Sequence, residues 1–148
     1  MSDKQNKPIT VFISYSWDSE EHKAWVKMLA DRLYKEGFKV LLDQYLPYGS
    51  SLTVFMHDSL RKADKVLIIG TPNYKAKAEE HKGGTGLEDQ IININMAQDI
   101  STIKFIPVLR KGEFSTSFTV LVGDRLGFDF RDDATFESEF SILLNSLA

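Results

Sequence analysis

The fold prediction starts from residues 9–15, Ile-Thr-Val-Phe-Ile-Ser-Tyr. The run is rich in β-branched and aromatic residues and almost continuously apolar, as in a strand buried on both faces of a sheet. Strands of this kind belong to parallel sheets that helices cover on both sides. The fold therefore depends on whether helical segments connect this strand to others like it.

Four more short apolar runs follow along the chain. They are residues 38–42, 65–70, 104–109 and 127–130. Segments with helical spacing separate the buried strands, and such connections require parallel pairing with right-handed crossovers. The sequence therefore predicts a three-layer α/β domain with a flavodoxin-like strand order, in which helices flank a parallel sheet of four to five strands. Pro107 suits a central ladder position poorly, so its strand is expected to be short or near an edge.

The expected helices have recognisable ends. Asp18, with an acidic capping-box partner three residues later, is a candidate N-cap for the first helix, and Gly37 supplies its C-terminal stop. Ser51 is expected to cap a second helix. The third is expected after Gly86, at the end of a polar stretch of residues 73–85. The last helix carries apolar residues at helical spacing, namely Phe136, Phe140, Leu143, Leu144 and Leu147.

Composition limits the classes of function. The 148 residues include 18 Lys+Arg and 21 Asp+Glu, and the net charge of −3 argues against a chain-wide basic surface for nucleic acid, although a local patch stays open. Cysteine is absent, which excludes disulfides and thiolate chemistry and suits a reducing cytoplasm. No apolar run has the length of a membrane span. We expect a short flexible arm at residues 1–8 and one domain at residues 9–148.

Several kinds of site have no support in the sequence. His22, His57 and His81 are scattered without metal-ligand spacing, so no metal site is expected. Ser14 lacks the flanking glycines of a nucleophile elbow. No acceptor aspartate follows the strand at residues 65–70, which excludes the phosphoacceptor chemistry of a receiver domain. The remaining candidates are the polar and aromatic residues that follow the strands, where α/β sheets bind ligands.

Glu88 stands out by its position in the first turn of the expected third helix, directly after the glycine-rich segment 83–86. One interpretation is structural, because the helix dipole favours an acid there. The other is functional, since the same dipole keeps the carboxylate ionised. An ionised carboxylate beside flexible glycines suits stabilisation of a developing cation or hydrogen bonds from sugar hydroxyls. The local sequence leaves both interpretations open.

An ordered set of motifs resembles the Toll/interleukin-1 receptor (TIR) domain family. Residues 11–16 resemble its first box, and Asp43 with residues 46–49 resembles its second box. Residues 59–69 resemble the segment that leads into the third strand. The segment 83–88 is similar to the catalytic segment of bacterial members and of the related SEFIR branch. Matches to the fourth and last strands complete the set, at residues 105–108 and 128–130.

The resemblance implies an enzyme that cleaves NAD⁺, as substrate rather than cofactor, at the nicotinamide–ribose bond. It maps Glu88 onto the catalytic glutamate of the family. Ser14, Tyr15 and Asp43 would line the pocket at the strand ends, and Trp17, Tyr45 and Tyr48 are candidates for stacking on a substrate ring. Other substrate-binding candidates are Gly83, Gly84 and Leu87. The product would be ADP-ribose or a cyclic form of it.

The resemblance also implies partners and leaves an alternative open. Gly84 stands where animal and plant members usually have an aromatic residue, so the stacking partner must come from elsewhere. The loop of residues 43–51 is expected to contact other TIR domains, so that self-association activates the enzyme in bacterial antiviral signalling. A cyclic-nucleotide sensor is expected beyond Ala148, in a longer antiphage protein. The alternative is a non-catalytic scaffold that recruits other TIR domains.

Overall fold

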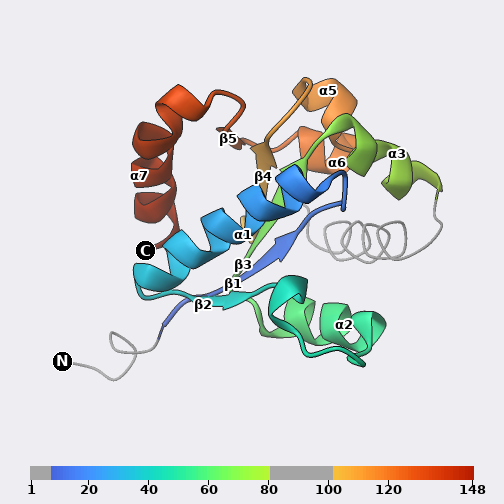
Figure 1. The fold of residues 1–148 in the computed structure, drawn as a ribbon. Coiled ribbons are helices and arrows are strands. Elements are labelled where there is room, and N and C mark those ends of the chain that lie inside the picture. Colours follow the sequence, from blue (N-terminus) through green and yellow to red (C-terminus); the bar gives the residue numbers. More distant parts are fainter. Residues whose placement is uncertain (1–7, 81–101) are drawn as a thin grey trace.

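A computed structural model describes residues 8–80 and 102–148 (Figure 1). Its sheet has five strands in the order β2-β1-β3-β4-β5, and every neighbouring pair is parallel. The strands are β1 (Thr10–Ser14), β2 (Lys39–Leu41), β3 (Lys65–Gly70), β4 (Phe105–Leu109) and β5 (Phe128–Asp129). This is the predicted parallel sheet with flavodoxin-like order. Apart from Pro8, the predicted arm at residues 1–8 lies outside the described residues.

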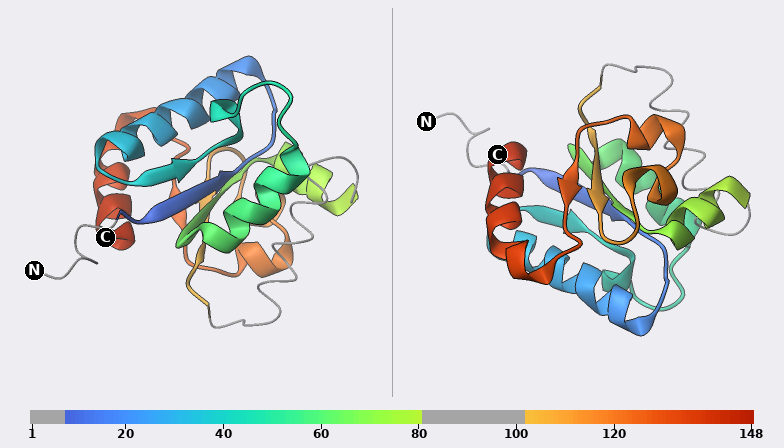
Figure 2. Two further views of the ribbon diagram at one scale, coloured as in Figure 1. Left: turned by 90° about the horizontal axis from the view of Figure 1, so that it is seen from below. Right: turned by 90° about the horizontal axis from the view of Figure 1, so that it is seen from above.

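Helices cover both faces of the sheet, as the two views in Figure 2 show. One face carries α1 (Glu20–Lys35) and α7 (Phe136–Leu147). The other carries α2 (Leu52–Lys62), α3 (Pro72–Glu80), α5 (Phe114–Ser117) and α6 (Val120–Gly123). The predicted three layers are therefore present.

The continuous apolar runs follow from this double coverage. In β1, Val11 and Ile13 point into the core under α1 and α7, whereas Phe12 points into the core under α2. In β3, Leu67 and Val66 divide between the same two cores. Successive side chains of a strand point to opposite faces, so a strand between two helical layers needs apolar residues at every position.

The start of α1 differs from the prediction. Ser19, not Asp18, is the N-cap, and its hydroxyl accepts a hydrogen bond of 3.0 Å from the backbone N–H of His22. The carboxylate of Asp18 instead accepts hydrogen bonds from Ser16 and Asn73, so it is committed to a tertiary contact. Past the other end of α1, Gly37 has a φ of 100°, the left-handed conformation expected of a C-terminal stop.

The second helix and the third strand match the prediction closely. Ser51 caps α2, since its hydroxyl accepts a hydrogen bond of 3.2 Å from the N–H of Val54. β3 has the predicted bounds, and the loop between β2 and α2 includes a 3-10 turn at Asp43–Tyr45. The turn gives the loop a fixed start directly after β2.

The polar stretch that was expected to be a lead-in contains a helix, α3. Tyr74 and Ala78 are its buried residues among those described, at a spacing of four. The hydroxyl of Thr71 accepts a hydrogen bond of 3.1 Å from the N–H of Tyr74 and so caps the first turn. Only one narrow stripe of this helix is apolar, which explains why periodicity did not reveal it. The helix expected after Gly86 falls outside the described residues.

β4 lies second from the edge, as Pro107 suggested. The edge strand β5 pairs with Val108 and Leu109, and Pro107 itself pairs only with Ile68 of β3. Gly127 packs so closely on the Pro107 carbonyl that a Cβ there would clash. The short helices α5 and α6 and a 3-10 turn at Asp133–Thr135 were not predicted, because segments of three or four residues have too little periodicity to detect.

Candidate functional site

The parallel sheet brings the carboxyl ends of its strands to one edge of the domain. The chain passes from β1 to β2 on one side and then to β3 on the other, so the order reverses next to β1. Open α/β sheets bind ligands at such a switch point, outside the carboxyl ends of the strands. The residues directly after β1, β2 and β3 are therefore the candidates for a site.

Asp43 joins two of the predicted site residues by hydrogen bonds. Its Oδ1 accepts a hydrogen bond of 2.7 Å from the hydroxyl of Tyr15. Its Oδ2 accepts one of 2.8 Å from the indole Nε1 of Trp17. One carboxylate after β2 thus holds two aromatic side chains that follow β1, and Tyr15, Trp17 and Asp43 form a connected cluster.

Gln44 extends this cluster to the first helix. Its Nε2 donates hydrogen bonds to the Tyr15 hydroxyl, at 2.8 Å, and to the backbone oxygen of Lys23, at 2.9 Å. Burial and the neighbouring carboxylate of Asp43 raise the pKa of Tyr15 far above its usual value of 10.0. The phenol therefore stays protonated and acts as a hydrogen-bond donor to Asp43 over the physiological pH range.

A second carboxylate, Asp18, ties the end of β1 to the start of α3. Its Oδ1 accepts hydrogen bonds from the Ser16 hydroxyl and, at 2.8 Å, from the amide of Asn73. Burial by itself would raise the pKa of Asp18, but these hydrogen bonds outweigh it and the pKa lies below the usual 3.8. Asp18 is therefore ionised at neutral pH. The Ser16 hydroxyl also lies 3.5 Å from that of Thr71.

His22 lies beneath this cluster, where α1 begins. It is 3% exposed, and within the described part of the chain neither ring nitrogen has a hydrogen-bond partner. Burial lowers its pKa below the usual 6.5, and the cations Lys111 and Arg110 act in the same direction, while Asp18 opposes them. The imidazole is therefore neutral at physiological pH.

Arg110, directly after β4, is fixed in place. Its Nη1 donates hydrogen bonds to the Phe130 backbone oxygen at 2.7 Å and to Asp133 at 2.9 Å. Its guanidinium carbon lies 4.4 Å from the centre of the buried Trp25 ring. This arginine therefore packs β4 against the aromatic core below α1 and α7.

The other predicted site residues have hydrogen-bond partners other than Asp43, are exposed, or lie outside the described residues. Ser14 is buried, with its hydroxyl 3.0 Å from that of Tyr74. Tyr45 donates a hydrogen bond of 2.6 Å to Asp31 of α1, and Tyr48 is fully exposed in the loop of residues 43–51. The remaining ones, Gly83, Gly84, Leu87 and Glu88, lie outside the described residues.

The prediction did not include Gln44, Asp18 or Tyr74 among the site residues. Tyr74 lies in the segment that follows β3, so its position gave a signal. Gln44 and Asp18 also follow strands, but nothing in the sequence identified their partners, which lie on other elements.

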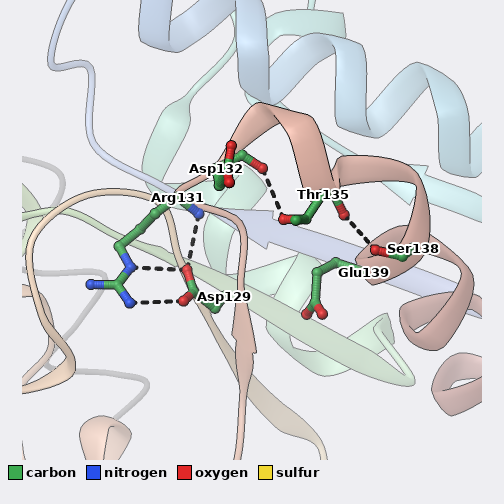
Figure 3. A pocket seen from close by; sticks show the side chains of 6 residues that line it. All are labelled: Asp129, Arg131, Asp132, Thr135, Ser138 and Glu139. Carbon is green, nitrogen blue, oxygen red and sulfur yellow. Dashed lines mark hydrogen bonds and ion pairs between the residues drawn. The ribbon is translucent and has the colours of Figure 1, made fainter.

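An open hollow of about 630 Å³ lies where β5 ends and α7 begins (Figure 3). It is lined by Asp129, Arg131, Asp132, Thr135, Ser138 and Glu139. Its Arg131 is paired with Asp129 at 2.8 Å and with Glu113 at 3.0 Å. The hollow contains none of the predicted site residues, and its one cation is already neutralised by carboxylates.

Metal and membrane features were searched in residues 8–80 and 102–148. There, no group of three or more His, Asp or Glu side chains could hold a metal ion. Within the same residues no helix is both long and apolar enough to cross a membrane.

Comparison with known proteins identifies the family. The TIR domain family matches residues 11–144, which is most of the chain. The chain belongs to the TIR domain family. Among solved structures, this TIR domain is similar to a prokaryotic SEFIR domain, with 34% identity, a TM-score of 0.72, and coverage of 94% of this chain and 98% of that one. No curated protein matches it.

Two more distant structures share the fold of this TIR domain. The TIR domains of the activated Roq1 resistosome, which recognises the pathogen effector XopQ, are 15% identical, with a TM-score of 0.65 and coverage of 95% and 99% of the two chains. The TIR domain of the Toll-related receptor TRR-2 from Hydra magnipapillata is also 15% identical, with a TM-score of 0.65 and coverage of 93% and 96%. TIR domains as a class self-associate. The predicted family and its link to the SEFIR branch are confirmed.

Proposed function

We propose that this TIR domain is an NAD⁺ glycohydrolase that cleaves the nicotinamide–ribose bond. The observation that carries the proposal is the cluster in which Asp43 holds Tyr15 and Trp17. It places an exposed aromatic ring and fixed hydrogen-bonding groups at the edge where α/β sheets bind ligands. Membership of a family that includes NAD⁺-cleaving enzymes supports the same activity.

The proposed chemistry needs few groups. The bond between the ribose C1′ and the pyridinium nitrogen breaks, its electron pair stays on nicotinamide, and C1′ becomes oxocarbenium-like. Nicotinamide leaves as a neutral amine, so no general acid is required. Glu88 would stabilise the positive charge with its ionised carboxylate. Water then adds to C1′ and releases a proton to give ADP-ribose; attack by an adenine nitrogen would give a cyclic product instead.

Self-association is the proposed means of activation. In the loop of residues 43–51, Tyr48 is fully exposed, and Leu52 and Val54 at the start of α2 are exposed as well. Exposed apolar side chains this close together favour contact with another protein surface. We propose a neighbouring TIR domain as that surface, within a cytoplasmic bacterial antiviral protein.

The same exposed residues favour a second candidate, a scaffold that binds other TIR domains without turnover. The two candidates differ in one observable, the release of nicotinamide. A scaffold releases none, even at concentrations where light scattering shows association.

The decisive experiment incubates the chain with NAD⁺ and measures released nicotinamide for the wild type and Glu88→Gln. Loss of one electrostatic contact to the transition state lowers the rate by ~10²–10³. Glu36→Gln is the matched control, because Glu36 is an exposed acid at the C-terminal end of α1. Equal rates for wild type and Glu88→Gln would remove Glu88 from the mechanism. No release from the associated wild type would favour the scaffold.

A further inference from the structure

Trp17 is an unusual tryptophan because it is both exposed and fixed. Its side chain is 55% exposed, whereas Trp25, the other tryptophan, is only 9% exposed. The indole N–H donates to Oδ2 of Asp43 at 2.8 Å, which sets the orientation of the ring. A pre-oriented ring loses little conformational freedom when a ligand stacks on it, so it suits ring recognition.

The charge beside Trp17 restricts which ring would stack there. The ammonium Nζ of Lys23 lies 4.9 Å from the centre of the Trp17 ring, over one of its faces. NAD⁺ carries two rings: a cationic pyridinium and a neutral adenine. The positive charge already over the indole repels the cationic pyridinium but does not repel the neutral adenine. The same ammonium, which also pairs with Glu20 at 3.6 Å, would attract the pyrophosphate that joins the two halves of NAD⁺.

The exposure of Trp17 leads to the same choice. The bond that breaks joins the pyridinium to ribose, and its oxocarbenium-like state is best formed where water is excluded. A ring that is half exposed suits the end of the substrate that does not react. Binding energy gained there still helps to position the reacting bond.

We propose that Trp17 is the stacking platform for the adenine of NAD⁺ and that Asp43 is a positioning residue that holds this platform without touching the substrate. The inference rests on the proposed function for the identity of the dinucleotide. Both oxygens of Asp43 already accept hydrogen bonds, from Tyr15 and from Trp17. Gln44 ties Tyr15 to the backbone oxygen of Lys23, so the main chain of the residue that carries the cation joins the same network.

The test compares two mononucleotides, AMP and nicotinamide mononucleotide, by calorimetry and tryptophan fluorescence. Each has one base, one ribose and one phosphate, so the base is the main difference between them. We expect AMP to quench the emission of Trp17. We expect Trp17→Ala to weaken AMP binding about tenfold or more, because a base stacked on an aromatic side chain contributes that much. Binding of nicotinamide mononucleotide should change less than twofold.

Leu126→Ala is the matched control for Trp17→Ala. Leu126 is also a large exposed apolar residue, but it precedes β5 and so lies at the opposite edge of the sheet. The Leu126→Ala variant should bind AMP with unchanged affinity. Absence of AMP binding, or AMP affinity that is unaffected by Trp17→Ala, would overturn the platform. If Trp17→Ala weakened the binding of nicotinamide mononucleotide but not that of AMP, the ring that stacks on Trp17 would be the pyridinium instead.

Asp43→Asn tests the positioning role, because the amide keeps the size but has one oxygen for the two donors. We expect weaker AMP binding and a shifted Trp17 emission. The effect on AMP should disappear in the Trp17→Ala background, since Asp43 acts through that ring. An equal loss in both backgrounds would show that Asp43 contacts the ligand. The nicotinamide-release assay is separate: if AMP stacks on Trp17 but NAD⁺ is not cleaved, the proposed function fails and the platform stands.

Discussion

The ring of Phe118 lies directly against Gly70, the last residue of β3. A Cβ on Gly70 would fall well inside van der Waals contact with the ring carbons of Phe118. Phe118 follows α5 and is fully buried in the core under α2 and α3. The glycine thus allows an aromatic ring to close this core at the carboxyl end of β3, next to the candidate site.

We expect Gly70→Ala to destabilise the domain by ~1–3 kcal/mol, the usual cost of overpacking a filled core. Urea unfolding followed by circular dichroism measures the free energy of unfolding. Gly123→Ala, in α6, is the matched control: its Cβ would lie 3.4 Å from the Phe114 oxygen and 3.5 Å from Cβ of Phe118, which is ordinary contact.

If the cost of Gly70→Ala is steric, it should depend on the size of residue 118. In the background of Phe118→Leu, whose side chain is smaller, the cost of Gly70→Ala should fall. If that cost stays the same, Phe118 is not the source of the strain. If Gly123→Ala costs as much as Gly70→Ala, the close approach at β3 has no special role.

The buried position of His22 leads to a prediction of how the free energy of unfolding depends on pH. Burial lowers the pKa of His22 in the folded state below 6.5, against the opposing effect of Asp18, and Lys111 and Arg110 add smaller effects in the same direction as burial. The unfolded chain therefore takes up a proton at higher pH than the folded domain, and the free energy of unfolding falls as the pH drops below about 6.5. The pKa of Asp18 is lowered from 3.8, so its own contribution is lost only in more acidic solution.

The measurement is the melting temperature of wild type and His22→Gln from pH 7 to pH 5. We expect the wild type to lose stability across this range and the variant to depend less on pH, whatever its absolute stability. Parallel curves for the two proteins would mean that His22 is not the group that titrates.

A substitution at Tyr48 tests whether the loop of residues 43–51 contacts a neighbouring domain. Because Tyr48 is fully exposed, Tyr48→Asp should leave the monomer as stable as the wild type. If the loop contacts a neighbouring domain, nicotinamide release by the wild type should rise faster than linearly with protein concentration, and the variant should stay monomeric and lose turnover. Light scattering and activity are measured over one concentration series. Full activity from a monomeric variant would show that each domain has a complete site.

Much of the fold was predictable because a strand that is buried on both faces has a continuous apolar run in its own sequence. Residues 66–69 are apolar at every position, so a buried strand was predicted over residues 65–70, and β3 has these bounds. α3 was missed because only Tyr74 and Ala78 are buried among its described residues, too few for a periodic signal. The cap of α1 was placed one residue early, because Asp18 bonds to Ser16 and Asn73 instead.

The candidate site was predictable in location but not in its contacts. Parallel strands required Tyr15 and Asp43 to emerge at one edge, and the structure places them there. Sequence periodicity could not tell that Tyr45 turns toward Asp31 of α1, or that Ser14 meets Tyr74 from a helix that was not expected.

Local residue patterns were enough to predict the parallel sheet and the edge at which the candidate site lies, because strand burial and helical connections depend on these patterns. That Asp43 holds Tyr15 and Trp17, which lie 28 and 26 residues before it, became visible only in the folded structure. A hydrogen bond between two loops depends on how closely the crossover brings them together and on which rotamers the surrounding packing allows. Neither quantity is encoded in the spacing of residues along the chain.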